Sequence, residues 1–146
     1  MTIKNLKALL PLVEKPSRYL GTEINSIKKN FDLVKLRFAL AFPDLYEIGM
    51  SHFGIQILYN ILNSQDEIEA ERVFAPGIDM EKQLKIHNMP LTSLESRKPL
   101  VSFDIIGFSL LYELTFTNIL TMLDLAKIPF MGNERDECQP LIIGGG

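Results

Sequence analysis

Apolar residues along the chain follow two spacings, one typical of buried strands and the other of helices. Continuous or alternating apolar runs predict strands at residues 34–42, 70–75, 91–94, 103–110 and 141–143. Spacings of three and four predict helices over 53–62 and 116–126, because side chains at those intervals share one helix face. The predicted apolar face of the first helix consists of Phe53, Ile57, Leu58, Ile61 and Leu62. Asp79 is the predicted N-cap of a further helix that runs to Asn88.

The first thirty residues differ from the rest. Residues 3–13 predict one short helix, and residues 14–23 predict an ordered loop with Pro16 and Gly21 as breakers. We therefore divide the chain into an N-terminal helix and loop (1–30) and an α/β domain (31–146). No cleavage site follows the short apolar run at 8–13, and no window approaches about 20 apolar residues. We expect no signal peptide, no membrane span and a cytoplasmic protein.

Strands that alternate with helices of ten to fifteen residues predict right-handed βαβ units. The expected fold is an open, doubly wound, mostly parallel α/β sheet of the Rossmann or flavodoxin type. Ligands of such sheets bind beyond the carboxyl ends of the strands. The candidate functional residues are therefore those that directly follow each strand.

Three of these strand ends carry candidate binding residues. They are Asp44, Tyr46 and Gly49 after the first strand, Ser109 and Leu111 at the end of the 103–110 strand, and Gly144 and Gly145 after the last. Glycines let a ligand approach the backbone closely, and a serine hydroxyl can donate a hydrogen bond. The alternative is that Asp44 caps a turn and that the glycines merely turn the chain.

Composition narrows the chemistry that this chain can carry. Its 146 residues include 15 Lys plus Arg and 18 Asp plus Glu, for a net charge of −3. A general nucleic-acid-binding protein normally has an excess of basic residues, which this chain lacks. The single cysteine, Cys138, cannot form an internal disulfide, complete a thiolate zinc site or hold an iron–sulfur cluster. We identify no metal ligands and no catalytic residues.

The three strand-end motifs, taken in their order along the chain, resemble the motifs of a known family. The set D-x-Y-x-x-G, S-x-L and G-G resembles the D-x-H-x-x-G, S-x-L and G-G signature of cobalamin-binding domains. The wider sequence resembles the N-terminal region of uncharacterised radical SAM proteins that begin with a cobalamin-binding-like domain. The matching segments are 15–23, 41–52, 71–76, 93–97, 103–110 and 113–115.

The resemblance implies a cofactor, and one residue departs from the family pattern. Tyr46 stands where the family has the histidine that ligates cobalt, and a phenol with a reference pKa of about 10 is a poor replacement. His52 is a second candidate ligand, and its alternative role is to pack at a helix start. Cobalamin is accordingly expected to bind without a protein ligand, or not at all.

The resemblance also implies a partner. Proteins of this family continue into a radical SAM barrel whose C-x-x-x-C-x-x-C loop holds a [4Fe–4S] cluster that cleaves S-adenosylmethionine. We expect that barrel, and all of the catalysis, beyond Gly146, so the chain itself is not expected to act as an enzyme. The sequence does not indicate the small-molecule or macromolecular substrate of the parent protein.

Three interpretations of function stay open at this level. The leading one is a module that presents cobalamin, or a cofactor-free crevice, to the barrel. The second is a degenerate structural or interaction domain that has lost cobalamin; it predicts exposed apolar surface. The third is a stand-alone enzyme that uses Glu47, Glu113 or His52, although no complete phosphate-binding glycine loop is present.

Overall fold

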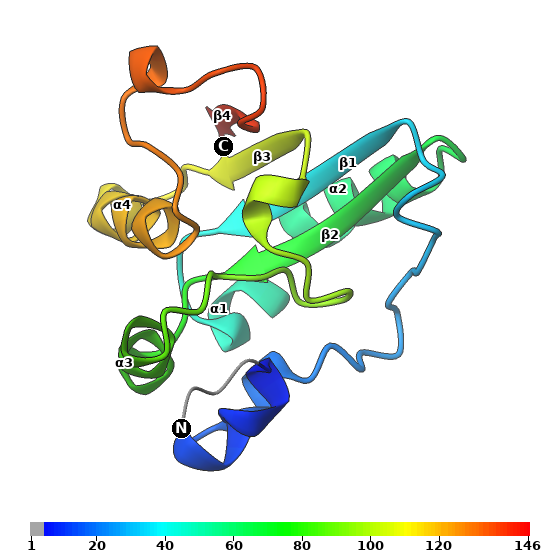
Figure 1. The fold of residues 1–146 in the computed structure, drawn as a ribbon. Helices are drawn as coiled ribbons and strands as arrows, with labels where there is room; N and C mark the ends of the chain where they lie inside the picture. The colour runs from blue at the N-terminus through cyan, green and yellow to red at the C-terminus, as the bar shows by residue number, and fades with distance from the viewer. Residues whose placement is uncertain (1–4) are drawn as a thin grey trace.

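A four-stranded parallel sheet is the centre of the molecule (Figure 1). The computed structural model describes residues 5–146. Its strands and α-helices are β1 (Leu36–Phe42), α1 (Tyr46–Met50), α2 (Phe53–Asn63), β2 (Ile68–Phe74), α3 (Ile78–Ile86), β3 (Ile105–Ser109), α4 (Phe116–Leu125) and β4 (Leu141–Gly145). Its 3₁₀ turns are η1 (Leu6–Ala8), η2 (Leu10–Leu12), η3 (Pro16–Tyr19), η4 (Leu100–Ser102), η5 (Glu113–Thr115) and η6 (Gly132–Glu134).

The sheet has the strand order β2-β1-β3-β4, and all of its neighbouring strands are parallel. The predicted doubly wound α/β class is therefore confirmed. The order of strands reverses between β1 and β3, the kind of place where such sheets bind ligands. Leu40 of β1 lies opposite both Arg72 of β2 and Gly107 of β3.

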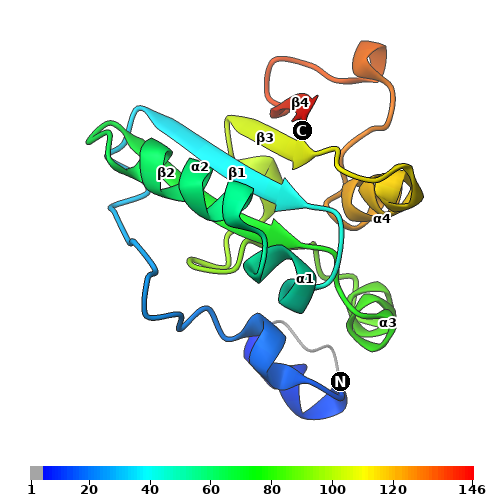
Figure 2. The same ribbon diagram turned by 180° about the vertical axis from the view of Figure 1, so that it is seen from behind.

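Helices cover the two faces of the sheet unequally. α2 lies along one face, over β1 and β2 (Figure 2), where Leu40, Phe42, Ile55 and Tyr59 form an apolar cluster. α3, α4, η4 and the N-terminal turns pack on the opposite face. The larger part of the core lies there, around Ala39, Val73, Leu100, Ile106 and Met122, which are all almost fully buried.

Three local predictions need correction. Residues 3 and 4 lie outside the described range, and 5–13 form two 3₁₀ turns, not one helix, because Pro11 lacks the amide that a continuous helix needs. Gly77, not Asp79, is the N-cap of α3; the Asp79 carboxylate instead accepts hydrogen bonds from the amides of Met80 and Glu14. The 91–94 segment is not a strand and makes only one isolated bridge, from Thr92 to Pro99.

The predicted apolar face of α2 is also largely wrong: of its five residues, only Leu62 packs against the apolar cluster beneath the helix. Ile55, Tyr59 and Asn63 face the sheet, whereas Phe53, Ile57 and Ile61 are exposed. The Tyr59 hydroxyl accepts a hydrogen bond from the amide of Ile27, and the Asn63 side chain bonds both the amide and the carbonyl of Ala70. These polar tips reach partners only when this side of the helix faces inward.

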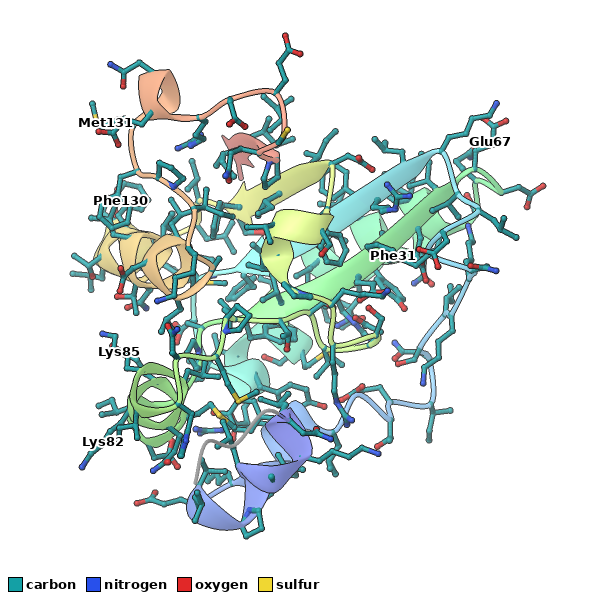
Figure 3. The ribbon with its side chains drawn as sticks, viewed as in Figure 1. Phe31, Glu67, Lys82, Lys85, Phe130 and Met131 are labelled. Carbon is teal, nitrogen blue, oxygen red and sulfur yellow. The ribbon has the colours of Figure 1, made fainter. Side chains whose placement is uncertain are left out.

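The long loop before β1 closes the amino end of the sheet. The ring of Phe31 meets that of Phe103 edge to face at 5.2 Å and lies under the charges of Arg37 and Lys98 (Figure 3). On the other side of the molecule, Phe130 and Met131 lie exposed on the connection that follows α4 (Figure 3). No helix within residues 5–146 is long and apolar enough to cross a membrane.

Candidate functional site at the carboxyl edge

The four strands end at one edge of the sheet, on the left in Figure 1, where α3 and α4 also lie. A groove of about 590 Å³ opens at this edge beside the ends of β1 and β2. It is lined by Glu14, Arg18, Asp44, Leu45, Ala75, Pro76, Gly77, Ile78, Asp79, Glu81, Lys82, Asn118 and Thr121. Most of these side chains are polar, so the groove suits a hydrated or hydrogen-bonding ligand.

Asp44 holds the end of β1 in place. Its carbonyl accepts the amide of Ala75 at 3.0 Å, and its carboxylate accepts the amide of Leu45 at 2.7 Å. From α4, the Asn118 amide donates to the carbonyl of Pro43 at 2.9 Å. These bonds fix the turn that aims Asp44 into the groove. Asn118 is not predictable as a site residue from the sequence, because an asparagine inside a helix has no distinctive signal.

Tyr46 is turned away from β3 and β4. Its hydroxyl donates to the Glu23 carboxylate at 2.9 Å, and its ring meets that of Phe74 edge to face at 5.5 Å. Burial, reinforced by the hydrogen bond to Glu23, raises the pKa of Tyr46 to about 12. The phenol is neutral at physiological pH and committed to a partner within the domain.

Gly49 has a packing role. A Cβ atom at this position would lie 2.2 Å from Cε1 of Phe74 and 3.1 Å from Cδ1 of Phe42. Only glycine therefore lets α1 sit this closely on the ends of β1 and β2. The third residue of D-x-Y-x-x-G thus fixes the helix that carries Tyr46.

The other four predicted site residues meet at the ends of β3 and β4. Ser109 lies opposite Gly145, whose carbonyl accepts the amide of Leu110 at 2.8 Å. Leu110 packs over Gly144, where a Cβ would come within 2.7 Å of it, whereas a Cβ at Gly145 would meet nothing within 4 Å. Leu111 is partly buried against the apolar cluster beneath α2.

The predicted residues therefore form two groups at one edge. Asp44, Tyr46 and Gly49 lie beside the ends of β1 and β2, whereas Ser109, Gly144 and Gly145 lie at the carboxyl ends of β3 and β4. Leu111 follows β3 and packs against the apolar cluster beneath α2, which Tyr46 also contacts. The open backbone at Gly145 suits the close approach of a planar ligand. Tyr46 does not suit the role of a cobalt ligand, because its hydroxyl is bound to Glu23.

The residues of the stand-alone enzyme hypothesis are not gathered into one centre. Glu47 accepts hydrogen bonds from Arg18 at 2.9 Å and Lys15 at 3.5 Å, and the bond from Arg18 lowers the pKa of Glu47. Glu113 lies on the exposed turn η5. His52 occupies the N-cap position of α2, with its ring 5.4 Å from that of Phe42. Each side chain thus has its own separate surroundings.

Exposed apolar side chains line the same edge. Ile48 and Phe53 follow β1, whereas Tyr112, Leu114 and Phe116 follow β3. Phe53 is 82% exposed and Leu114 is 92% exposed. We call these five residues the apolar collar. Large exposed apolar side chains at one edge of a sheet favour an interaction surface, because their burial against a partner is stabilising. The clue in the sequence is the apolar residues of the loop between β3 and α4.

Within residues 5–146, no group of three or more His, Cys, Asp or Glu side chains is arranged to hold a metal ion, and Cys138 is exposed. Comparison with protein families matches residues 54–146 to the family described as radical SAM proteins, N-terminal. The match spans more than half of the chain and includes the β3 and β4 groups of the site. No curated protein and no solved structure matches the chain.

Proposed function

Because the chain belongs to the family of N-terminal domains of radical SAM proteins, we propose that it presents its carboxyl edge to the catalytic barrel of such a protein. The observation that carries the proposal is the apolar collar, whose exposed side chains follow β1 and β3, the two central strands of a doubly wound sheet. Family membership supplies the tethered partner. Tethering raises the effective concentration of that partner to the millimolar range, so even a modest apolar surface is sufficient for docking.

The domain contributes binding and positioning. A radical SAM barrel supplies the [4Fe–4S] cluster and the S-adenosylmethionine, and with them the electron transfer and the radical chemistry. Asp44, Asn118 and Thr121 line a groove that faces the same edge, and this groove can hold a small polar molecule beside the interface. No proton transfer or bond cleavage is assigned to residues of this chain.

Cobalamin is the cofactor that we propose for the open backbone at Gly145, beside Ser109 and Gly144. A corrinoid there would rest on the ends of β3 and β4 without a protein ligand on cobalt, since Tyr46 is held by Glu23. When bound, cobalamin supplies methyl-transfer or radical chemistry. The alternative function is an interaction domain that has lost the cofactor, and the occupied Tyr46 hydroxyl favours it.

Hydroxocobalamin separates these two alternatives. The chain is incubated with it and passed through a gel-filtration column while visible absorbance is followed. Cobalamin binding predicts a co-eluting corrinoid near one equivalent, reduced at least tenfold by Gly145→Leu, because the new side chain would occupy the open space above the strand end. Gly132→Leu is the matched control, because a Cβ at Gly132 also meets nothing within 4 Å.

The outcomes are distinct. Co-elution that Gly145→Leu abolishes and Gly132→Leu preserves supports the corrinoid site. Absence of a co-eluting corrinoid in the folded wild-type chain contradicts cobalamin binding and leaves the interaction domain. Binding that survives Gly145→Leu places the corrinoid elsewhere and contradicts the proposed site.

A further inference from the structure

A small apolar cavity lies between the N-terminal turns and the end of β2, next to the polar groove. Its volume is about 40 Å³. Residues of η1, β2, α3 and the segment after α3 form most of its wall. The apolar part of the lining consists of Leu6, Val73, Phe74, Ala75, Pro76, Met80, Leu84, Leu91 and Leu94. A cavity with an apolar lining stays dry and favours an apolar occupant.

The two tyrosines in the cavity wall already have hydrogen-bond partners. The Tyr46 hydroxyl donates to Glu23 at 2.9 Å, and the Tyr19 hydroxyl accepts the amide of Gly77 at 3.0 Å. An occupant of the cavity therefore needs no polar group to satisfy them. A water-sized group needs about 10–15 Å³ of such space, so the cavity holds about three of them. That space suits a short, branched alkyl arm.

The cavity adjoins the groove, because Arg18, Ala75 and Pro76 line both. Asp44, which also lines the groove, is a direct neighbour of this boundary. Its carbonyl accepts the amide of Ala75 at 3.0 Å. A ligand that lies along Ala75 and Pro76 therefore reaches the apolar cavity with one end and Asp44 with the other.

The groove is acidic. Its charged lining consists of Glu14, Asp44, Asp79, Glu81, Arg18 and Lys82. The charge of Arg18 is balanced by Glu47, with which it forms an ion pair at 2.9 Å. The positive end of the α3 dipole is likewise complemented by Asp79 and Glu81 in its first turn. The charge that complements this groove is therefore positive.

The cation that fits these carboxylates is an ammonium group. Within residues 5–146, no group of three or more His, Cys, Asp or Glu side chains is arranged to hold a metal ion. An ammonium group has three rotatable donors and can bond to dispersed acceptors. An ionised carboxylate offers about four acceptor positions, and the amide of Leu45 takes one on Asp44. Aliphatic amines are protonated at neutral pH, as Lys is with its pKa of about 10.4.

We propose that the cavity and the groove together bind a small aliphatic amine. Its branched alkyl arm occupies the cavity, and its ammonium group faces Asp44. The proposal names a ligand for the groove and rests on the binding role that the proposed function gives to it. The corrinoid site and the apolar collar take no part. Amine binding is measured in the 1–146 chain without the barrel, so it can fail while docking holds, and docking can fail while amine binding holds.

A titration of the 1–146 chain with 3-methylbutylamine, followed by amide NMR, tests the proposal. Binding in the millimolar range is expected for a ligand of this size, with shifts at the amides of Leu45, Ala75 and Gly77. Three matched probes each change one feature. Methylamine lacks the arm, 3-methylbutanol lacks the charge, and 3-methylbutanoate reverses it. Each is expected to bind at least about tenfold more weakly.

Two substitutions test where the probe lies. Ala75→Leu fills the boundary between cavity and groove and is expected to weaken binding of 3-methylbutylamine at least about tenfold. Asp44→Asn keeps an oxygen for the amide of Leu45 but removes the charge, and it is expected to weaken binding at least about fivefold. Asp66→Asn is the matched control, because Asp66 is exposed before β2 at the amino end of the sheet. It is expected to change binding less than about twofold.

The preference for 3-methylbutylamine, weakened by both substitutions and kept by Asp66→Asn, supports the proposal. Absence of amide shifts up to about 50 mM probe overturns it. Equal binding of 3-methylbutanoate, 3-methylbutanol or methylamine overturns it as well, because charge or arm is then not recognised. Binding that survives both Ala75→Leu and Asp44→Asn places the amine elsewhere and contradicts the site. The four probes are compared on the unsubstituted chain, so the test holds even where Ala75→Leu fails to fold.

Discussion

Arg72 and Glu95 form an ion pair that is buried at the β2 edge of the sheet. The guanidinium donates to the carboxylate at 2.6 Å, and the Arg72 amide donates to its second oxygen at 2.8 Å. The guanidinium also lies 4.2 Å from the centre of the Tyr59 ring. The pair therefore joins β2 to the segment after α3 and to α2. Burial nonetheless raises the pKa of Glu95 to about 7, and Arg72 only partly offsets that effect.

This raised pKa predicts a pH dependence of stability. The folded state binds the Glu95 proton more tightly than the unfolded state, whose carboxyl titrates near its ordinary pKa of 4.5. The stabilisation from this group is complete below about pH 4.5 and is lost as the pH rises through about 7. The expected decrease in the free energy of unfolding is about 3 kcal/mol between pH 4 and pH 8.

Urea unfolding at several pH values measures this slope. Glu95→Gln cannot titrate, so it should flatten the slope between pH 5 and pH 8, although it lowers stability overall by leaving Arg72 unpaired. Glu67→Gln changes an exposed carboxylate and should preserve the wild-type slope. An identical slope in wild type and Glu95→Gln would show that Glu95 titrates normally.

Among the elements, α1 packs closely on the ends of β1 and β2 because Gly49 has no side chain. Gly49→Ala is expected to destabilise the domain by about 1–3 kcal/mol, because its Cβ would overlap the ring of Phe74. Gly132→Ala, where a Cβ meets open space, is expected to change stability by less than about 0.5 kcal/mol. Thermal or urea unfolding distinguishes them, and equal stabilities would contradict the packing role of Gly49.

The main elements follow from the apolar pattern because each strand is a short run bounded by breakers. β1, β2, β3 and β4 lie within one or two residues of the predicted runs. The orientation of α2 does not follow from the apolar pattern, because apolar residues lie on two sides of this helix and either side could face the sheet. The choice between them depends on where Tyr59 and Asn63 find partners, in Ile27 and in Ala70. Such contacts across distant segments have no signature in local spacing.

For the candidate site, too, the sequence predicts which residues are near one another but not how each side chain is oriented. Ser109 and Gly145 both lie at strand ends in the predicted pattern, and the structure places them opposite each other because parallel strands end at one edge. The direction of Tyr46 depends on Glu23, which lies 23 residues earlier in the chain. The apolar collar does not follow from sequence spacing, because the exposure of Leu114 depends on the tertiary structure. Motifs locate a site, whereas long-range contacts decide which side chains are free to act in it.

In the whole molecule, a parallel sheet carries two surfaces that its own helices leave open. They are the polar groove and the apolar collar. Both lie at the carboxyl edge, where doubly wound domains hold ligands. Exposed apolar side chains at one edge suit a domain that packs against a partner, which agrees with its membership of the family of N-terminal domains of radical SAM proteins.

Photo-crosslinking in the whole radical SAM protein tests whether the carboxyl edge of the sheet faces the catalytic barrel. A benzophenone amino acid replaces Leu114 in the collar or, as control, Leu33, which is 79% exposed before β1 at the amino end of the sheet. Irradiation is expected to join position 114, and not position 33, to peptides of the barrel. Crosslinks to the barrel from position 33 alone, or from neither position, would show that the carboxyl edge does not face the barrel.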